Sequence, residues 1–187
     1  SSGAAPTQEQ QKDVSKPSPS ASSSSQPESS AGSVTKPIES SKADAQQPAQ
    51  QTVSYRWPMA AGEVINPFSG ENLVKNKTLN VWRVHDAVDI KGEKGAAVLA
   101  VGGGKVAAIS ADALWGGMIQ LEHADGTVTV YSGVTADKSL KTGQQVKAGD
   151  AIGVLDQIPA EIAMEPHIHL TMSKNGKAVD PETLLTK

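Results

Sequence analysis

Residues 164–172 read MEPHIHLTM and carry two of the four histidines in this 187-residue chain, His167 and His169. Side chains alternate between the two faces of a strand, so both imidazoles would project from one face while Ile168 and Leu170 point to the other. We therefore expect a β-strand here, with a hydrophobic core on one side and paired histidines on the other. Two imidazoles that converge on one spot suit a metal ion, a proton relay, or both.

A second polar pair lies upstream, where residues 83–92 read RVHDAVDIKG. His85 and Asp89 are four residues apart and share a face in a strand or a helix, and Val88 and Ile90 favour the strand. Two imidazoles and one carboxylate make a zinc site that leaves one position open for water. The alternative is a set of structural histidines whose ring nitrogens are satisfied within the fold. The chain has no cysteine, which excludes Cys-based zinc sites.

The rest of residues 53–187 has the spacing of short strands joined by tight turns. Turns are expected at 102–104 (GGG), 125–126 (DG), 148–150 (AGD) and 175–176 (NG), each between short apolar runs. No stretch has a long helical period. We expect a compact all-β domain of antiparallel strands, closed or nearly closed.

Residues 1–52 differ from this domain in composition. Ser, Gln, Pro and Ala dominate, and no aromatic residue is present. Such a segment buries too little apolar surface to offset its ordering entropy, so we expect a disordered linker that tethers the domain, the alternative being a spacer without function. No apolar run reaches the roughly 18–20 residues that cross a bilayer, so a membrane anchor would lie upstream. The formal charge of −3 argues against a generally basic nucleic-acid binder.

The chain resembles the lysostaphin/LytM-type zinc peptidases of bacterial cell walls over about residues 58–181. The resemblance rests on the order and spacing of five segments: RVHDAVDI, AAVLAVGGGKVAAI, IQLEHADGTVTVYSG, GQQVKAGDAIG and PHIHLTM. It implies a LytM-type fold, an antiparallel barrel-sandwich. It also implies one zinc ion held by His85, Asp89 and His169, with His167 as the catalytic base.

The chain departs from the family pattern at one catalytic position. The family ends a strand with Y-x-H, whereas here Tyr131 is followed two residues later by Gly133. His123 lies ten residues before this position and does not easily substitute. Ala87 also replaces the usual glycine of H-x-G-x-D. Tyr131 and Trp82 are candidates for lining a peptide groove.

The lead-in GEVINPFSGENLVKNKTLNVWRVHDAVDI, residues 62–90, resembles a subgroup of the family, the clostridial form of stage II sporulation protein Q. That subgroup also lacks the Y-x-H histidine. The resemblance implies an extracytoplasmic location in the cell envelope of a Gram-positive-type bacterium, membrane-tethered or secreted. The partners would be an envelope protein or peptidoglycan peptides, and no nucleic acid.

Two functions remain open at this point. One is a non-catalytic or weakly active interaction module in an envelope or sporulation complex. The other is an active zinc metalloendopeptidase that cleaves peptidoglycan peptides. Gly133 favours the first, because loss of a single catalytic group costs on the order of 10²–10⁴ in rate.

Overall fold

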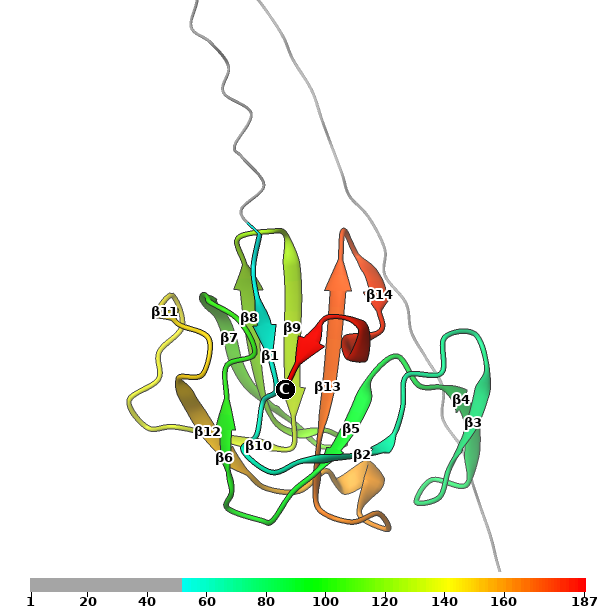
Figure 1. The fold of residues 1–187 in the computed structure, drawn as a ribbon. Helices are drawn as coiled ribbons and strands as arrows, with labels where there is room; N and C mark the ends of the chain where they lie inside the picture. The colour runs from blue at the N-terminus through cyan, green and yellow to red at the C-terminus, as the bar shows by residue number, and fades with distance from the viewer. Residues whose placement is uncertain (1–51) are drawn as a thin grey trace, which may run out of the picture. The chain divides into compact units, whose positions relative to one another are not determined.

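The computed structural model describes residues 52–187, so the linker expected over residues 1–52 lies outside the described residues except for Thr52. The described part consists of strands and two short 3₁₀ helices, and none of its helices is long and apolar enough to span a membrane. The expected all-β fold is confirmed (Figure 1).

The strands are short and follow one another closely. In chain order the elements are β1 (Tyr55–Arg56), β2 (Glu63–Asn66), β3 (Leu73–Asn76), β4 (Val81–Val84), β5 (Val88–Lys91), β6 (Ala97–Leu99), β7 (Gly104–Asp112), β8 (Gly116–His123), β9 (Thr127–Ser132), β10 (Val134–Ala136), β11 (Gln145–Val146), β12 (Ala151–Leu155), the 3₁₀ helix η1 (Pro159–Glu161), β13 (His167–Lys174), β14 (Lys177–Val179), the 3₁₀ helix η2 (Pro181–Thr183) and β15 (Leu185–Thr186).

One large sheet carries the HxH segment at its centre. Its strand order is β11-β7-β8-β9-β13-β5-β2, with β14 also paired to β13, and a smaller sheet has the order β10-β12-β6. All pairings within these two sheets are antiparallel, as expected. The exception elsewhere is β1, which pairs in parallel with β15 and so joins the two ends of the domain.

The hydrophobic core draws side chains from both sheets. Ile168 and Leu170 of β13 are fully buried in it, as the alternation of that segment predicts. Tyr131 of β9 is opposite Leu170 in the register, so its side chain also enters the core. It is fully buried, and its hydroxyl accepts a hydrogen bond from the Val101 backbone N–H at 2.7 Å. The prediction that Tyr131 lines a groove is therefore wrong.

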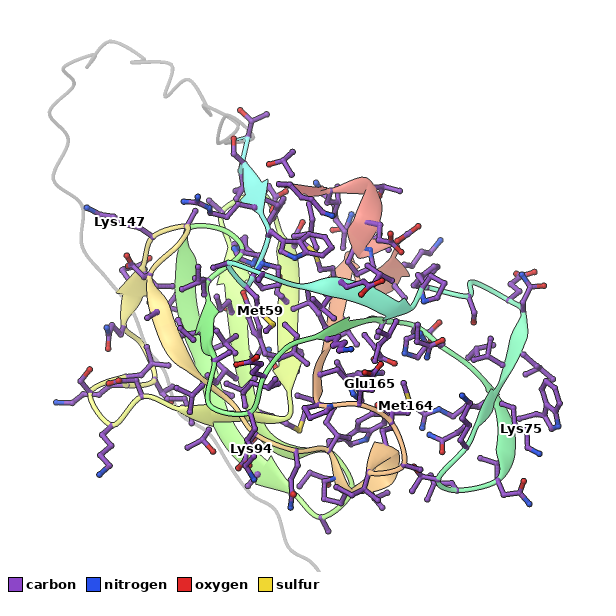
Figure 2. All side chains as sticks on the ribbon, turned by 60° about the horizontal axis from the view of Figure 1, so that its bottom comes forward. Met59, Lys75, Lys94, Lys147, Met164 and Glu165 are labelled. Carbon is purple, nitrogen blue, oxygen red and sulfur yellow. The ribbon has the colours of Figure 1, made fainter. Side chains whose placement is uncertain are left out.

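A hairpin of β3 and β4 projects from the domain and contacts the segment around η1. The Ala163 backbone N–H donates to the Thr78 hydroxyl at 3.0 Å, which ties that segment to the hairpin turn. Figure 2 shows Met164 and Glu165 where the segment enters β13, and Lys75 on the hairpin. The two pieces thus meet beside the N-terminal end of β13, where the histidines begin.

Candidate metal centre

Strand register brings two of the predicted ligands together. β13 runs antiparallel to β5, and His169 is directly opposite Asp89. Opposed residues of an antiparallel pair share a face, so the two polar side chains meet. His169 Nδ1 donates to Asp89 Oδ1 at 2.8 Å. His167 is two residues earlier on the same face and is also buried.

His85 reaches the same place from a loop. The structure begins β5 at Val88, so His85 and Asp89 do not share one extended strand as the sequence suggested. The His85 ring is oriented instead by Nδ1–H, which donates to the Pro67 carbonyl at 2.9 Å. Its Nε2 then lies 3.1 Å from Asp89 Oδ2.

The side-chain ligand atoms of His85, Asp89 and His169 lie within 4.8 Å of one another, and all three residues are buried. His85 Nε2 has no hydrogen-bond partner although it is buried. With Nδ1 as the donor, the neutral ring directs an Nε2 lone pair towards a carboxylate, an arrangement that a cation between them would stabilise. The donor set therefore fits a zinc ion, and zinc binding itself stays a prediction.

A further side chain orients the Asp89 carboxylate. Asn66 of β2 donates through Nδ2 to Asp89 Oδ2 at 2.9 Å. Residues that support a metal ligand in this way fix its orientation and tune its affinity. Asn66 is thus a candidate supporting residue for the site, and the sequence did not single it out.

When no metal is bound, the charges of the cluster favour the ionised forms of Asp89 and Glu161 and the protonated forms of His167 and His169. Burial raises the pKa of Asp89, but the hydrogen bond from His169 and the other interactions with the neighbouring histidines outweigh it and hold that pKa well below its usual range. Burial lowers the pKa of His169, but its contacts with Asp89 and Glu161 raise the pKa above the ordinary value. Of the predicted ligands, His169 is therefore the one that is more readily protonated when no cation is bound.

His167, the predicted base, faces an acidic residue. Its Nδ1–H donates to the Glu165 carbonyl at 2.6 Å, and its Nε2 lies 3.1 Å from Glu161 Oε2. Burial lowers the pKa of His167, but its hydrogen bonds to Glu161 and to the Glu165 carbonyl, together with the nearby charges of Asp89 and Glu161, raise the pKa above the ordinary value. For Glu161, burial raises the pKa, yet hydrogen bonds from His167 and His169 lower it to about 2. The two side chains form a buried ion pair.

Sequence reasoning missed Glu161. It stands in the apolar run IPAEIAM, residues 158–164, and matches no motif that we considered. The only available signal was a single charge in a segment otherwise composed of apolar residues. The structure shows Glu161 only 3% exposed, with its side chain turned towards the histidines.

Gly133 directly follows β9 and has a backbone φ of +77°, in the left-handed region that favours glycine. A β-carbon at this position would come within 2.6 Å of Ile158 Cγ1 and 3.3 Å of the His167 carbonyl oxygen. Ile158 itself is buried. The place where the family has a catalytic histidine thus has a backbone conformation that disfavours side chains, and another side chain fills the space beside it.

His123 does not join the cluster. Its ring nitrogens bond to the Gly103 carbonyl and to the Thr129 hydroxyl, at 2.9 and 2.8 Å, and its ring packs edge-on against Tyr55. Its contacts are those of a satisfied structural histidine. As expected, it does not replace the missing Y-x-H histidine.

Two tryptophans near the site differ in their surroundings. The Trp115 ring packs against the His169 ring with centroids 4.6 Å apart, and the Arg83 guanidinium lies over Trp115 at 4.8 Å. Trp82 lies on the exposed face of β4 and is 65% exposed. A groove role for Trp82 stays a prediction.

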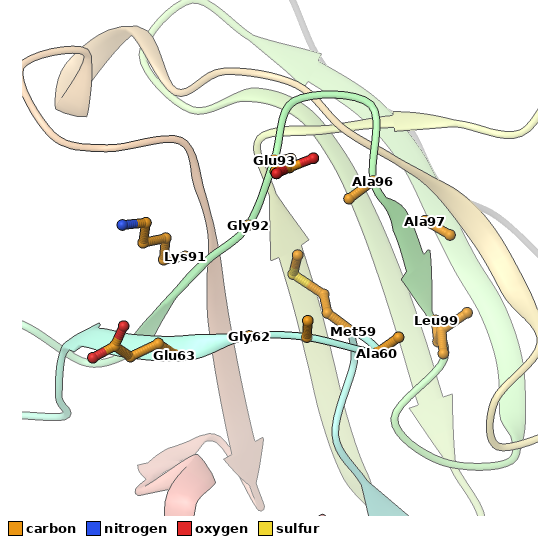
Figure 3. A pocket seen from close by; sticks show the side chains of 11 residues that line it. Met59, Ala60, Gly62, Glu63, Lys91, Gly92, Glu93, Ala96, Ala97 and Leu99 are labelled. Carbon is orange, nitrogen blue, oxygen red and sulfur yellow. The ribbon is translucent and has the colours of Figure 1, made fainter.

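The cavity that reaches His167 and Glu161 is small, about 160 Å³, and Ile158 and Pro166 also line it. A larger hollow of about 720 Å³ opens between β2 and the β5–β6 connection, with Met59 on its floor (Figure 3). No histidine lines it. Ligand pockets usually measure about 300–1,000 Å³, so the cavity beside His167 is narrow for a peptide.

Comparison with protein families shows that residues 83–181, more than half of the chain, match peptidase family M23. The chain belongs to this family. The matched region contains all four buried residues of the cluster, His85, Asp89, His167 and His169, together with Glu161 and Gly133. The M23 family comprises zinc metallopeptidases, which agrees with the donor set described above.

Individual relatives are more distant. The chain is 26% identical over 140 residues to the cell division protein DipM of Caulobacter vibrioides, covering 71% of this chain and 21% of DipM. It is 30% identical over 84 residues to stage II sporulation protein Q of Bacillus subtilis, covering 45% of this chain and 29% of that protein. The chain thus spans between a fifth and a third of the length of these relatives.

Among solved structures, the fold matches that of a SpoIIQ–SpoIIIAH pore-forming complex with a TM-score of 0.63 and 23% identity. The match covers 72% of this chain and 92% of the other. At this level of identity the likeness establishes the LytM-type fold, which the sequence predicted.

Proposed function

We propose that the domain binds one zinc ion through His85, Asp89 and His169, and that it acts as a non-catalytic or weakly active interaction module in an extracytoplasmic envelope or sporulation complex. When bound in such a site, zinc supplies Lewis acidity and lowers the pKa of water. The proposal concerns what the other residues of the site do with that chemistry.

The observation that carries the proposal is the structure around Gly133. The second catalytic histidine of the family is absent, and its space is taken by Ile158. Of the two catalytic histidines of the family, only the one at His167 remains, and its Nε2 pairs with Glu161. Each missing proton-transfer or oxyanion-stabilising group costs on the order of 10²–10⁴ in rate.

The partner and location are inferred from relatives. The SpoIIQ chain that this fold resembles was solved in a complex with SpoIIIAH. We infer an envelope protein of that kind as the partner, with a membrane anchor upstream of this chain and the domain outside the cytoplasm. Titration calorimetry with the SpoIIIAH-type protein of the same genome tests this inference, and absence of binding would contradict it.

The catalytic half of the proposal is tested by hydrolysis. The full chain is loaded with zinc and incubated with purified peptidoglycan, and released muropeptides are separated and counted. We expect release that is absent or far slower than that of an active M23 peptidase assayed alongside. Release at the rate of that peptidase, stimulated by zinc and abolished by His167→Ala, would overturn the proposal and establish the second candidate, an active peptidase that cleaves peptidoglycan peptides.

A further inference from the structure

Glu161 occupies the space between the two histidines of the HxH pair. Its Oε2 lies 3.1 Å from His167 Nε2 and 3.6 Å from His169 Nδ1. It belongs to a second group of potential ligand atoms, from Asp89, Glu161 and His167, that all lie within 4.8 Å of one another. Asp89 is common to this group and to the predicted zinc ligands. The carboxylate of Glu161 is therefore directly beside the predicted metal position.

The surrounding structure holds Glu161 in this orientation. The 3₁₀ helix η1 is fixed at its start by the Ala160 backbone N–H, which donates to the Leu114 carbonyl at 2.9 Å. Two side chains of the β3–β4 hairpin then approach the outer carboxylate oxygen, Oε1: Asn76 Nδ2 at 3.4 Å and Arg83 at 3.5 Å.

The two oxygens of this carboxylate therefore have separate surroundings. Oε1 faces the hairpin, and Oε2 faces the histidines. A carboxylate that served only to neutralise Arg83 would not need to direct an oxygen into the cluster. Oε2 pairs with His167, and its second lone pair remains available for a metal ion.

We propose that Glu161 supplies, through Oε2, a fourth protein ligand to the zinc ion held by His85, Asp89 and His169, and that it thereby closes the site. This inference rests on the zinc binding proposed above. Catalytic zinc sites have three protein ligands and an open position, whereas sites with four protein ligands are structural. Glu161 would fill the position that a substrate or water needs.

The closure explains two further features of the site. The cavity beside His167 measures only about 160 Å³, and both Glu161 and Ile158 line it. The hydrogen bond between Ala163 and Thr78 links the η1 segment to the β3–β4 hairpin, so the segment that carries Glu161 is held in place. A closed zinc site would hold these pieces against the sheet and stabilise the surface they present.

The competing interpretation is that Glu161 only pairs with His167 and leaves the fourth position open. Cobalt(II) substitution separates the two. Three protein ligands and a water also make a four-coordinate site, so the intensity of the cobalt spectrum does not distinguish the two interpretations. Azide does, because it replaces the water of an open position and changes the spectrum, whereas a position filled by Glu161 gives no response. For the wild-type chain we expect no response to azide.

The matched variants are Glu161→Ala and Glu165→Ala. Both remove one carboxylate from the same segment, but the Glu165 side chain is 58% exposed and pairs with Lys91 at the surface. In Glu161→Ala we expect an azide response and a loss of zinc affinity of at least the roughly 10–100-fold that removal of a supporting residue costs elsewhere. Glu165→Ala should match the wild type in both measurements.

Each result is decisive. An azide response in the wild-type chain equal to that of Glu161→Ala would overturn the fourth ligand while leaving zinc binding intact. Because the wild-type spectrum is itself a test, poor folding of Glu161→Ala would not remove it. Failure of the wild-type chain to bind either zinc or cobalt would instead overturn the proposed function.

Discussion

The two histidines of the HxH pair are two residues apart and have different surroundings. His169 faces Asp89 and His85, in an arrangement with every donor atom that a zinc site requires. His167 faces Glu161, beside a glycine where the family has a second catalytic histidine. The predicted ligands of the metal half are all brought together, whereas a glycine stands at one position of the proton-transfer half. Under the proposed function, one sheet would present a metal site without the chemistry usually associated with it.

The difference has a physical origin in how each half is built. The metal half depends mainly on the register of β5 against β13, which the core side chains on the opposite face also fix. The other half depends on Gly133, which follows β9, and on the connection between β12 and β13 that contains η1. Connections between strands tolerate changes in conformation and sequence that a paired strand does not.

The largest expected effect separates the two halves directly. His169→Ala removes a predicted ligand and should reduce zinc affinity by more than the roughly 100-fold at the upper end for supporting residues. His167→Ala should leave zinc affinity within a few-fold of the wild type. Competition with a fluorescent zinc chelator measures both. Equal losses in the two variants would show that both histidines bind the metal.

A smaller effect is expected for Asn66→Ala, which acts within the metal half. It removes the hydrogen bond to Asp89 and should lower zinc affinity by about 10–100-fold. The same competition assay applies, with Asn72→Ala as a control because the Asn72 side chain bonds to Ser69 in an exposed turn. An unchanged affinity in Asn66→Ala would show that Asp89 needs no support.

The other half is tested at Gly133. Gly133→Ala should destabilise the domain by about 1–3 kcal/mol, because its β-carbon meets Ile158 and its φ of +77° disfavours any side chain. Thermal unfolding of the zinc-loaded chain provides the measurement. Gly126→Ala has a similar φ but no neighbour within 4 Å, so it reports the backbone cost alone.

The same geometry bears on repair of the site. Gly133→His should be destabilised at least as much as Gly133→Ala and should gain no hydrolysis. A folded, active Gly133→His protein would contradict the view that Ile158 and the backbone block this position.

The smallest effect concerns pH. In the metal-free chain the pKa values of His167 and His169 are raised by their carboxylate partners, so the folded chain holds these protons more tightly than the unfolded chain does. The resulting stabilisation is complete below about pH 6.5, the ordinary histidine pKa, and is lost as pH rises through the raised values. The melting temperature of the metal-free chain should therefore fall as the pH is raised above about 6.5.

Zinc should reverse this dependence. Metal binding requires neutral imidazoles, so the melting temperature of the zinc-loaded chain should rise over the same interval. If the melting temperature depended on pH in the same way with and without zinc, the histidines would not bind the metal. Below about pH 4, the ordinary range for carboxyl groups, both forms should lose stability, because the pKa values of Asp89 and Glu161 are lowered in the fold.

The sequence predicted the parts of this structure that depend on local patterns. Alternation around His167 and His169 indicated the strand and its two faces, and the Asp125-Gly126 pair indicated the β8–β9 hairpin. The gathering of His85, Asp89 and His169 was predicted as well. Tyr131 was misplaced because its face follows from pairing with Leu170, a contact between distant segments.

Glu161 and Ile158 could not be predicted for a related reason. Both lie in a short segment without periodicity, and their positions are set by the hairpin contacts and by the space left at Gly133. No local pattern encodes which side chain of such a segment turns inward. The arrangement around His167 and Gly133 therefore could not be predicted from the sequence alone.

The most direct test of the account is to measure zinc content and muropeptide release on one sample of the full chain, purified without chelator. We predict about one zinc per chain and at most slow zinc-dependent release from peptidoglycan. A chain without zinc that also fails to take it up would contradict the metal half of the comparison. A zinc-loaded chain that releases muropeptides at the rate of an active M23 peptidase, in a His167-dependent way, would contradict the other half.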